Sequence, residues 1–246
     1  MTNNQDWFES WFDTEWYHTL YSDRDESEAQ LFIRNLLTHL APAGHAKILD
    51  LACGKGRHSL QINEMGFDVW GVDLSKQSIA EAAKQANENL NFAEHDMRKV
   101  FKPKHFDYIL NLFTSFGYFN SNVDNLNVMQ SVCEGLNDNG TFVLDFLNAK
   151  KVKSNLVNHE QVEKENITFS INRSIENNVI VKNIGFVDGG KSFQFEERVT
   201  AFELRDLKKL FEPYKLEIKE IFGSYNLDPF DELTSDRLIL IAQKNQ

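Results

Sequence analysis

The stretch Ile48-Leu49-Asp50-Leu51-Ala52-Cys53-Gly54-Lys55-Gly56-Arg57-His58 decides the fold, because it joins an apolar strand-like run, a turn with two glycines and the start of a helix. Residues 47–51 are predicted as a strand and residues 57–65 as the helix that follows it. In an open sheet of parallel strands, ligands bind at the carboxyl ends of the strands, which is where this turn lies. We therefore expect a ligand to pass close to Gly54 and Gly56, where a side chain would collide with it.

Strand-like and helix-like segments alternate on both sides of this stretch. Further strands are predicted at residues 67–72, 91–94, 106–112, 141–147, 216–222 and 237–242, and helices at 27–40, 77–87, 123–136 and 202–211. Such alternation is typical of a parallel sheet with helices on both faces. Since no helix lies between the last two strands, they can pair antiparallel. The sequence thus predicts an α/β, Rossmann-like fold with a seven-stranded, mostly parallel sheet.

Two segments stand outside this alternation. Residues 160–201 alternate apolar and polar side chains around turns at Asn177-Asn178 and Gly189-Gly190, which predicts an inserted antiparallel β-meander. Residues 7–21 are dense in aromatic side chains and precede an amphipathic segment at 27–40, so this region is interpreted as an N-terminal helical lid.

The composition limits the partners of the chain. Its 246 residues carry 26 Lys and Arg against 37 Asp and Glu, a net charge of -11, which disfavours long nucleic acid as a partner. A hydrophobic content of 41% excludes disorder for most of the length. Cys53 and Cys133 lie in no CxxC or His cluster, so neither a metal site nor a disulfide framework is expected. The polar, acidic start and the lack of an ~18-residue uncharged apolar run predict no membrane partner and a cytoplasmic location.

Three polar residues around the glycine turn indicate what kind of ligand it binds. Asp73 follows Gly54 by nineteen residues and ends the second predicted strand, where a carboxylate can accept both hydroxyls of an adenosine ribose. A dinucleotide site needs a third glycine, but Ser59 stands in its place. Asp50, just before the turn, would repel phosphate and attract an ammonium group, although it can also simply accept hydrogen bonds from the loop amides. An amino-acid nucleoside therefore fits better than a dinucleotide.

The turn is the first of several motifs along the chain. Leu49 to Gly56 is followed by Gly71-Val72-Asp73-Leu74-Ser75, by His95-Asp96-Met97-Arg98 and, after the fourth strand, by Asn111 to Phe119. In this order and spacing the sequence resembles the class I S-adenosylmethionine-dependent methyltransferases, strongly over residues 46–147 and more weakly over 202–243. Ala52 departs from the glycine that is commoner at its position in that family.

The resemblance implies S-adenosyl-L-methionine as the cofactor and gives each motif a role. The first motif would pass under the methionine part, Asp73 would bind the ribose and Leu74 would lie against the adenine. Asp96 and Met97 would contact the adenine amino group and the other face of the ring. Arg24 would meet the cofactor carboxylate, or else pair with its acidic neighbours. The residues assigned to the cofactor are Asp50, Ala52, Gly54, Gly56, Arg57, Asp73, Leu74, Asp96, Met97, Asn111, Tyr21 and Arg24.

The aromatic lead, the meander and the ending Phe222-Gly223-Ser224-Tyr225 resemble glycine N-methyltransferase-like enzymes, which implies a small-molecule acceptor methylated at N or O. Methyl transfer from a sulfonium is a direct displacement, so the protein mainly aligns the reactants and excludes water, and a general base is optional. Tyr118 and His18 are the candidate catalytic residues, with Tyr225 as a second orienting group. For His58 a surface or capping role is favoured over that of a base.

Several alternatives remain open at this level. Residues 1–150 are interpreted as the lid and cofactor-binding core, 151–201 as a sheet that covers the substrate or mediates dimerisation, and 202–246 as the last helix and strands of the core. Phe113, Phe116, Tyr118 and Phe119 line an acceptor pocket or belong to the core. A cofactor-binding regulatory protein and an RNA methyltransferase are the alternative functions, and the net charge opposes the second. The chain is expected to be a monomer or a homodimer.

Overall fold

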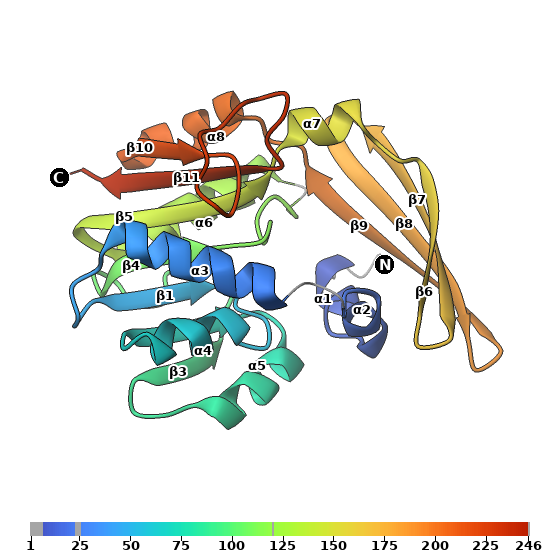
Figure 1. Ribbon diagram of the computed structural model, residues 1–246, viewed down its shortest axis with the longest axis horizontal. Coiled ribbons are helices and arrows are strands. Elements are labelled where there is room, and N and C mark those ends of the chain that lie inside the picture. Colours follow the sequence, from blue (N-terminus) through green and yellow to red (C-terminus); the bar gives the residue numbers. More distant parts are fainter. Residues whose placement is uncertain (1–6, 23–25, 120, 246) are drawn as a thin grey trace.

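The computed structural model describes residues 7–22, 26–119 and 121–245. Within these ranges the chain forms a sheet of seven strands, a separate sheet of four strands and the helices that flank them (Figure 1). No helix in the described ranges is long and apolar enough to cross a membrane.

The larger sheet is the predicted one. Its strands, in spatial order, are β10 (Leu216–Phe222), β11 (Arg237–Lys244), β5 (Leu136–Leu147), β4 (Phe106–Asn111), β1 (Lys47–Leu51), β2 (Asp68–Asp73) and β3 (Leu90–Glu94). Neighbouring strands from β5 to β3 are parallel, whereas β11 is antiparallel to both β5 and β10. The Rossmann-like, mostly parallel sheet is therefore confirmed, and the carboxyl ends of β1, β2 and β4 meet at one edge.

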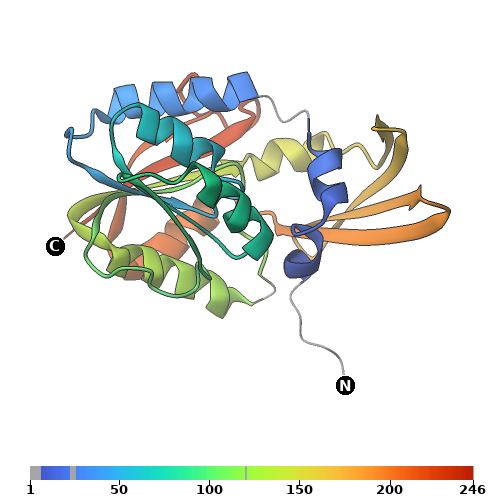
Figure 2. The ribbon, with the colours of Figure 1, turned by 90° about the horizontal axis from the view of Figure 1, so that it is seen from below.

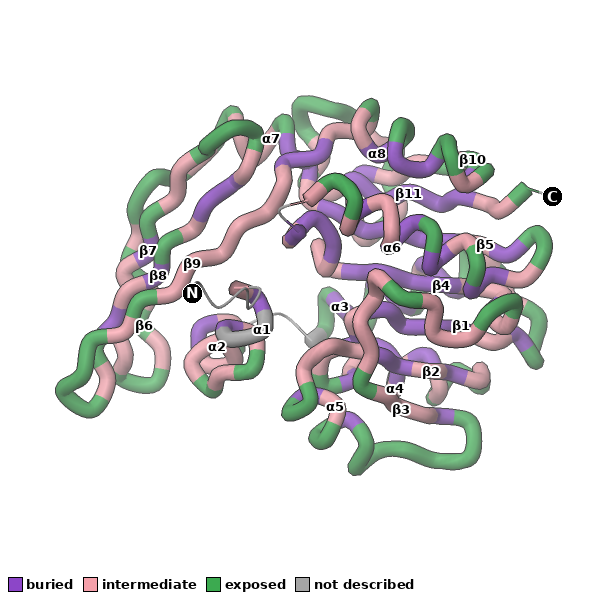
Figure 3. The backbone as a smooth tube through the Cα atoms, turned by 180° about the vertical axis from the view of Figure 1, so that it is seen from behind, coloured by how far each residue is buried: buried purple, intermediate pink, exposed green. Residues whose placement is uncertain are grey.

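Helices cover both faces of this sheet. α3 (Glu26–Leu40) and α4 (Arg57–Glu64) lie on one face, and α6 (Asn122–Gly135) and α8 (Leu204–Phe211) lie on the other (Figure 2). Side chains alternate along a strand, so Ile48 and Leu49 of β1 enter two different apolar clusters, one under α3 and one under α6 and α8. α5 (Lys76–Ala82) packs against β2 and β3. The most buried backbone follows the central strands (Figure 3).

Two element boundaries differ from the prediction by more than two residues. The helix expected over 77–87 ends at Ala82 and continues only as a 3-10 turn, Ala83–Gln85, since the Asn87 side chain accepts a hydrogen bond from the Asn89 amide and starts a turn. β5 begins at Leu136, five residues before its predicted start, and includes the Asn137–Gly140 segment. A register shift between Phe106 and Tyr108 accommodates this segment beside β4.

The smaller sheet is the predicted antiparallel meander. Its strands β6 (His159–Lys164), β7 (Ile167–Glu176), β8 (Val179–Asp188) and β9 (Lys191–Thr200) pair in sequence order. Each two-residue turn has positive φ at both positions, as the right-handed twist of a hairpin requires, and the turns are Glu165-Asn166, Asn177-Asn178 and Gly189-Gly190. Asparagine and glycine tolerate this conformation well, which explains their choice.

The insertion leaves and rejoins the core at neighbouring points. α7 (Ala149–Ser154), a helix that the sequence analysis did not predict, begins directly after β5. At the other end of the insertion, the amide of Thr200 donates to the carbonyl of Gly117 (2.8 Å) and the amide of Ala201 donates to the carbonyl of Asn178 (2.8 Å). Ala149, Ile180 and Ala201 are buried together there.

The aromatic lead is helical and binds the smaller sheet. It comprises α1 (Trp7–Trp11) and α2 (Glu15–Leu20), which lie between the core and the meander (Figure 1). The Trp11 ring stacks on Phe195 at 4.4 Å between centroids, and its indole nitrogen donates to Glu197 at 2.7 Å. Trp16 packs on Phe193 at 4.3 Å and donates to Asp188 at 2.9 Å. The lead is therefore anchored to β8 and β9 by both apolar and polar contacts.

Candidate active site

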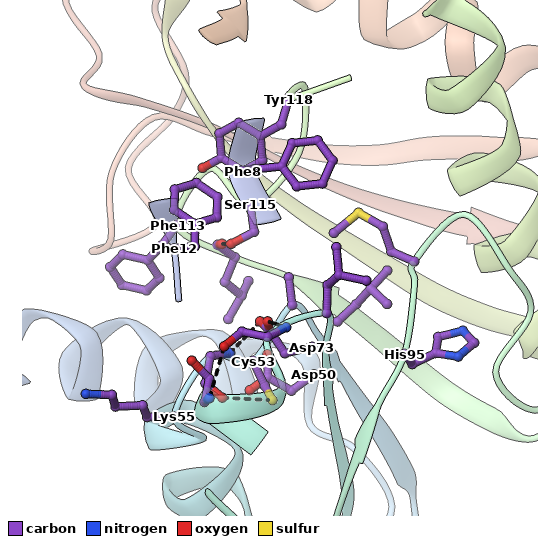
Figure 4. A pocket seen from close by; sticks show the side chains of 18 of the residues that line it. Phe8, Phe12, Asp50, Cys53, Lys55, Asp73, His95, Phe113, Ser115 and Tyr118 are labelled. Atoms are coloured by element: carbon purple, nitrogen blue, oxygen red, sulfur yellow. Dashed lines mark hydrogen bonds between the residues drawn. The ribbon is translucent and has the colours of Figure 1, made fainter. Parts of the chain in front are cut away.

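A cavity of about 280 Å³ opens at the carboxyl ends of β1, β2 and β4. Figure 4 shows aromatic side chains, among them Phe8, Phe12 and Tyr118, on one side of it and Asp50 and Asp73 on the other. Of the predicted site residues, the following line it: His18, Asp50, Ala52, Gly54, Arg57, Asp73, Leu74, Asp96, Met97 and Tyr118. Most of the side chains that the sequence assigned to one site are thus brought together.

The two glycines of the turn have different surroundings. Gly54 lines the cavity with φ +56°, and a Cβ added there would meet no atom within 4 Å. A Cβ on Gly56, with φ +81°, would lie 2.6 Å from the Phe92 ring and 3.1 Å from Ala82. Gly56 is not a lining residue, so it permits close packing of α4, whereas Gly54 leaves room for a ligand.

Asp73 joins the end of β2 to the turn after β1. Its carboxylate accepts hydrogen bonds from the backbone amides of Gly54 and Ser75, both at 2.8 Å. Burial raises the pKa of this carboxyl, although the backbone hydrogen bonds oppose the shift. Each carboxylate oxygen has a further lone pair, so the group can still accept hydrogen bonds from a ligand in the cavity.

Asp50 is a second buried carboxylate, at the end of β1. Its side chain is 1% exposed and accepts a 2.6 Å hydrogen bond from the Ser59 hydroxyl. Burial, together with the negative charge of Asp73, raises the pKa of Asp50 to about 6 despite the Ser59 hydrogen bond. Ser59, which replaces the third glycine of a dinucleotide fingerprint, is thus a partner of this carboxylate. Two buried carboxylates at one cavity favour a cationic ligand.

Asp96 lies beside the cavity in an ion pair that the sequence did not reveal. The Arg98 guanidinium binds both carboxylate oxygens, with Nε 3.0 Å from each and a terminal nitrogen 2.9 Å from Oδ2. Burial would raise the pKa of Asp96, but Arg98 holds it below its usual range. Arg98 itself lies over the Phe119 ring at 5.0 Å. The pair fixes Asp96, Met97 and Phe119 along one wall.

Asn111 is fully buried at the end of β4. Its side-chain nitrogen donates to the Leu51 carbonyl at 2.9 Å, and its Oδ1 has no hydrogen-bond partner among the residues that the structure describes. Asn111 does not line the cavity. Leu51, to which it is hydrogen-bonded, and Leu112, the next residue in the sequence, both do. Asn111 therefore holds the end of β1 from behind the cavity wall, through the carbonyl of Leu51.

Aromatic rings form the other end of the cavity. Tyr118 lies 5.3 Å from Phe12 and 5.6 Å from Trp7, both edge to face, and its hydroxyl donates to the Thr114 carbonyl. Phe8, Phe12, Tyr17 and His18 of the lead are lining residues here. The sequence did not single out Phe8, Phe12 or Tyr17 as site residues. Their only sequence signal was the high density of aromatic side chains in residues 7–21.

His58 contributes to the wall through its neighbours. Its ring stacks on Phe113 at 4.7 Å with an angle of 11° between the planes, and its Nε2 accepts a 3.1 Å hydrogen bond from the Arg57 side chain. The same Arg57 guanidinium lies over Phe113 at 5.1 Å. An Nε2 that accepts a hydrogen bond belongs to a neutral imidazole.

Some predicted site residues lie elsewhere. Tyr21 is not a lining residue, because its hydroxyl donates to the Glu197 carboxylate at 2.7 Å and it packs against β8 and β9. Arg24 lies outside the described residues. Tyr225 stands behind the wall, 5.1 Å from Phe113 and 4.6 Å from Phe32. None of residues 151–201, all of which the structure describes, lines the cavity.

Comparison with known proteins gives this architecture a family. A sequence model described as "Methyltransferase domain" matches residues 43–222. The chain is 26% identical over 210 residues to YqeM of Bacillus subtilis (strain 168), whose name describes a methyltransferase, and the match covers 81% of this chain and 85% of that protein. It is 32% identical over 127 residues to a glycine/sarcosine N-methyltransferase of Aphanothece halophytica, covering 50% of this chain and 46% of the relative.

The fold comparison agrees. The crystal structure of a S-adenosylmethionine-dependent methyltransferase from Clostridium acetobutylicum ATCC 824 superposes with a TM-score of 0.78 at 20% identity, over 93% of this chain and 96% of that one. Together with the glycine turn and the cavity at the ends of β1, β2 and β4, these matches define the class. The chain belongs to the class I S-adenosylmethionine-dependent methyltransferase family, and S-adenosyl-L-methionine is its cofactor.

Proposed function

We propose that the protein transfers a methyl group from S-adenosyl-L-methionine to the nitrogen of a small-molecule amine. The observation that carries this is at the aromatic end of the cavity, where the Tyr118 hydroxyl already donates its proton to the Thr114 carbonyl. The His58 imidazole likewise has its Nε2 engaged by Arg57. A hydroxyl acceptor needs a base to take its proton, whereas an amine nitrogen can attack once it is neutral.

The cofactor fits the charged end of the cavity. When bound, S-adenosylmethionine would supply a methyl group on a positively charged sulfur. The lone pair of a neutral amine would form the new N–C bond as the C–S bond breaks, which leaves a neutral thioether and a methylated ammonium that loses its proton to solvent. Asp50 would attract the ammonium group. Asn111 would act indirectly, by holding the carbonyl of Leu51 on the cavity wall. Asp73 would accept the ribose hydroxyls while it holds the Gly54 amide.

The remaining assignments follow the cavity wall. Leu74, Asp96 and Met97 would enclose the adenine, with Arg98 keeping Asp96 in place. Ala52 and Gly54 leave the loop backbone open to the methionine part, and Arg57 would pair with its carboxylate. Tyr21 is left out because it faces β9, and Gly56 acts through packing rather than contact.

The aromatic end would hold the acceptor. Phe8, Phe12, Tyr17 and Tyr118 offer rings to a methylated or protonated nitrogen, which aromatic faces attract. His18 lies on the same wall and is the residue we assign to orienting the amine. The curated relative that shares 32% identity is named a glycine/sarcosine N-methyltransferase, which also supports a nitrogen acceptor.

The lead would act as a lid and the meander as its support. The lead, and not the meander, carries the lining residues Phe8, Phe12, Tyr17 and His18. The meander holds the lead through Trp11 and Trp16. We therefore propose that residues 151–201 shape acceptor binding indirectly, by fixing the lead over the cavity.

A radiolabelled methyl donor with a panel of acceptors tests the proposal. The panel would contain glycine, sarcosine, an amino sugar, a catechol, an aliphatic alcohol and total RNA. We expect labelled product from at least one amine and none from the hydroxyl compounds or RNA. Exclusive labelling of a hydroxyl compound would overturn the nitrogen assignment, and labelling of RNA would overturn the small-molecule assignment. Calorimetric binding of S-adenosylmethionine without any labelled product would favour a regulatory role.

A further inference from the structure

The turn after β4 has an unusual backbone conformation. Phe113 and Thr114 are consecutive non-glycine residues with φ of +55° and +62°, in the left-handed region. This region is uncommon for residues with a Cβ and most unfavourable for a β-branched residue such as threonine. Such a conformation persists only when surrounding contacts determine it, and it occurs preferentially at functional sites.

Every polar group of Thr114 has a partner. Its amide donates to the Asp145 carbonyl at 3.0 Å, and its Oγ1 accepts a 2.9 Å hydrogen bond from the Arg237 guanidinium. Its carbonyl accepts the Tyr118 hydroxyl. The amide of Phe113 donates to the Asp145 carboxylate at 2.8 Å. The turn is thus fixed from β5 and from β11 at the same time.

Asp145 and Arg237 form a buried ion pair behind this turn. The Asp145 side chain is 0% exposed, and Arg237 Nε lies 2.8 Å from its Oδ1. The Tyr225 hydroxyl donates to the other carboxylate oxygen at 3.3 Å, and the Arg237 guanidinium lies 5.4 Å from the Tyr225 ring. A buried ion pair is weak evidence for stability in itself, since desolvation offsets much of its attraction.

The ion pair and Thr114 do not line the cavity, but the residues they hold do. Phe113 lies on the wall beside His58 and Arg57, and Tyr118 lies among the rings of the lead. The same pair therefore positions a ring beside the charged end, Phe113, through the Asp145 carboxylate, and a ring at the aromatic end, Tyr118, through Thr114.

We propose that Asp145 and Arg237 are positioning residues for methyl transfer, which fix Tyr118 at the acceptor end of the cavity through Thr114 and fix Phe113 beside the charged end through the Asp145 carboxylate. The inference rests on the proposed function, because it treats the aromatic end as the place of the acceptor. Alignment of the acceptor is what the protein contributes to a direct displacement, so a small shift of this wall lowers the rate.

A matched pair of substitutions at Thr114 tests the proposal. Thr114→Val keeps the shape of the side chain but removes the oxygen that Arg237 contacts, whereas Thr114→Ser keeps the oxygen. With the best amine of the acceptor panel, we expect Thr114→Val to lower kcat/KM by about 10- to 100-fold and Thr114→Ser to restore it to within about threefold of the parent. S-adenosylmethionine binding, measured by calorimetry, should change by less than about threefold in both variants, since Thr114 does not line the cavity. Thr141→Val, in the middle of β5 and outside the cavity wall, is the control.

Arg237 offers a second pair in case a Thr114 variant fails to fold. Arg237→Lys keeps the charge beside Asp145, while Arg237→Gln removes it. Lys153→Gln is the control, because it breaks a partly exposed ion pair with Glu203, 3.0 Å long, that is not part of the turn. We expect a larger loss of turnover for Arg237→Gln than for Arg237→Lys, and a loss of less than about twofold for the control.

Amide hydrogen exchange separates this inference from the proposed function, because it needs no acceptor. Thr114→Val should speed exchange of the amides of residues 113–119 and leave those of β1 and β4 unchanged, with Thr114→Ser close to the parent. Unchanged exchange in Thr114→Val would overturn the positioning role, and so would faster exchange with undiminished turnover. If no amine in the panel is methylated, the nitrogen assignment fails while the exchange result still decides whether the ion pair holds the wall.

Discussion

The backbone amide of Gly54 donates a 2.8 Å hydrogen bond to the Asp73 carboxylate, so the loop after β1 is tied to the end of β2. The residue assigned to the ribose is therefore also the residue that shapes the glycine loop. One carboxylate links two motifs that lie nineteen residues apart in the sequence.

Replacement of Asp73 should weaken cofactor binding and loosen the loop. We expect Asp73→Ala to lower the affinity for S-adenosylmethionine by ~1 to 3 kcal/mol, because charge-assisted hydrogen bonds are lost. The free energy of unfolding should also fall, since the Gly54 and Ser75 amides lose their acceptor. Calorimetry and urea denaturation measure the two effects. Asp68→Ala, at the other end of β2, is the control, and an unchanged affinity in Asp73→Ala would remove Asp73 from the site.

The two glycines should respond differently to alanine. Gly54→Ala should prevent tight cofactor binding. It should lower the free energy of unfolding by only ~1 to 2 kcal/mol, because the left-handed backbone is strained but the added Cβ meets no atom. Gly56→Ala should cost ~1 to 3 kcal/mol more than that, because its Cβ would overlap Phe92. Thermal unfolding with and without S-adenosylmethionine distinguishes them. Gly66→Ala, with φ +98° and open space around its Cβ, measures strain alone. Equal stability of the three variants would contradict the packing role of Gly56.

Cofactor affinity should depend on pH through Asp50. Burial raises the pKa of this carboxyl to about 6, so it loses its negative charge as the pH falls below that value. Affinity for the cationic cofactor should therefore decrease from pH 7 to pH 5. Because the bound cation favours the ionised carboxylate, binding near pH 6 should release a proton. Calorimetry in two buffers of different ionisation enthalpy detects this release. The dependence should disappear in Asp50→Asn, and its persistence there would assign it to another group.

Asp50 should reduce the stability of the protein at neutral pH. The pKa in the folded state, about 6, is higher than the usual 3.8, so the folded state binds more protons between these values. The free energy of unfolding should consequently fall as the pH rises from 4 to 6. Asp50→Asn removes this penalty and should raise the free energy of unfolding at pH 7 by up to about 3 kcal/mol. Urea denaturation at pH 7 and pH 4 provides the measurement, and the gain should shrink at the lower pH. A destabilised variant at pH 7 would contradict the expectation.

The Tyr118 hydroxyl should be dispensable for chemistry. It donates to the Thr114 carbonyl, so its removal in Tyr118→Phe leaves the ring in the cavity and costs an orienting contact. We expect kcat for the best amine to fall less than about tenfold, whereas loss of a general base costs about 10²- to 10⁴-fold. Tyr108→Phe, on β4 and outside the cavity wall, is the control. A hundredfold or larger decrease in kcat would indicate that Tyr118 acts as a general base.

The sequence predicted those parts of the fold and site that depend on neighbouring residues. The strand, turn and helix of residues 47–65 and the position of Asp73 follow from local pattern and from the geometry of parallel strands. The placement of Tyr21 does not, because its partner Glu197 is 176 residues away. The packing around Gly56 could not be predicted either, because the ring closest to it belongs to Phe92 of β3.

The positions of Phe113 and Tyr118 on the cavity wall could not be predicted from the sequence either. Thr114 meets Arg237 across 123 residues, and Asp145 meets Arg237 across 92. Nothing in the pattern of residues 106–119 indicated two consecutive left-handed residues, since neither phenylalanine nor threonine favours that conformation. Tertiary contacts decided the backbone there.

The smaller sheet begins and ends at one place on the core, where Ala149 and Ala201 are buried side by side. A segment closed in this manner can be exchanged as a module, because its removal cuts no strand of the seven-stranded sheet. The lead is bound to it through Trp11 and Trp16, so the two would change together while Asp50 and Asp73, which we assign to the cofactor, stay as they are. If the lead holds the acceptor as we propose, acceptor choice could diverge in evolution separately from cofactor use, and the same boundary offers a place for building chimeric enzymes.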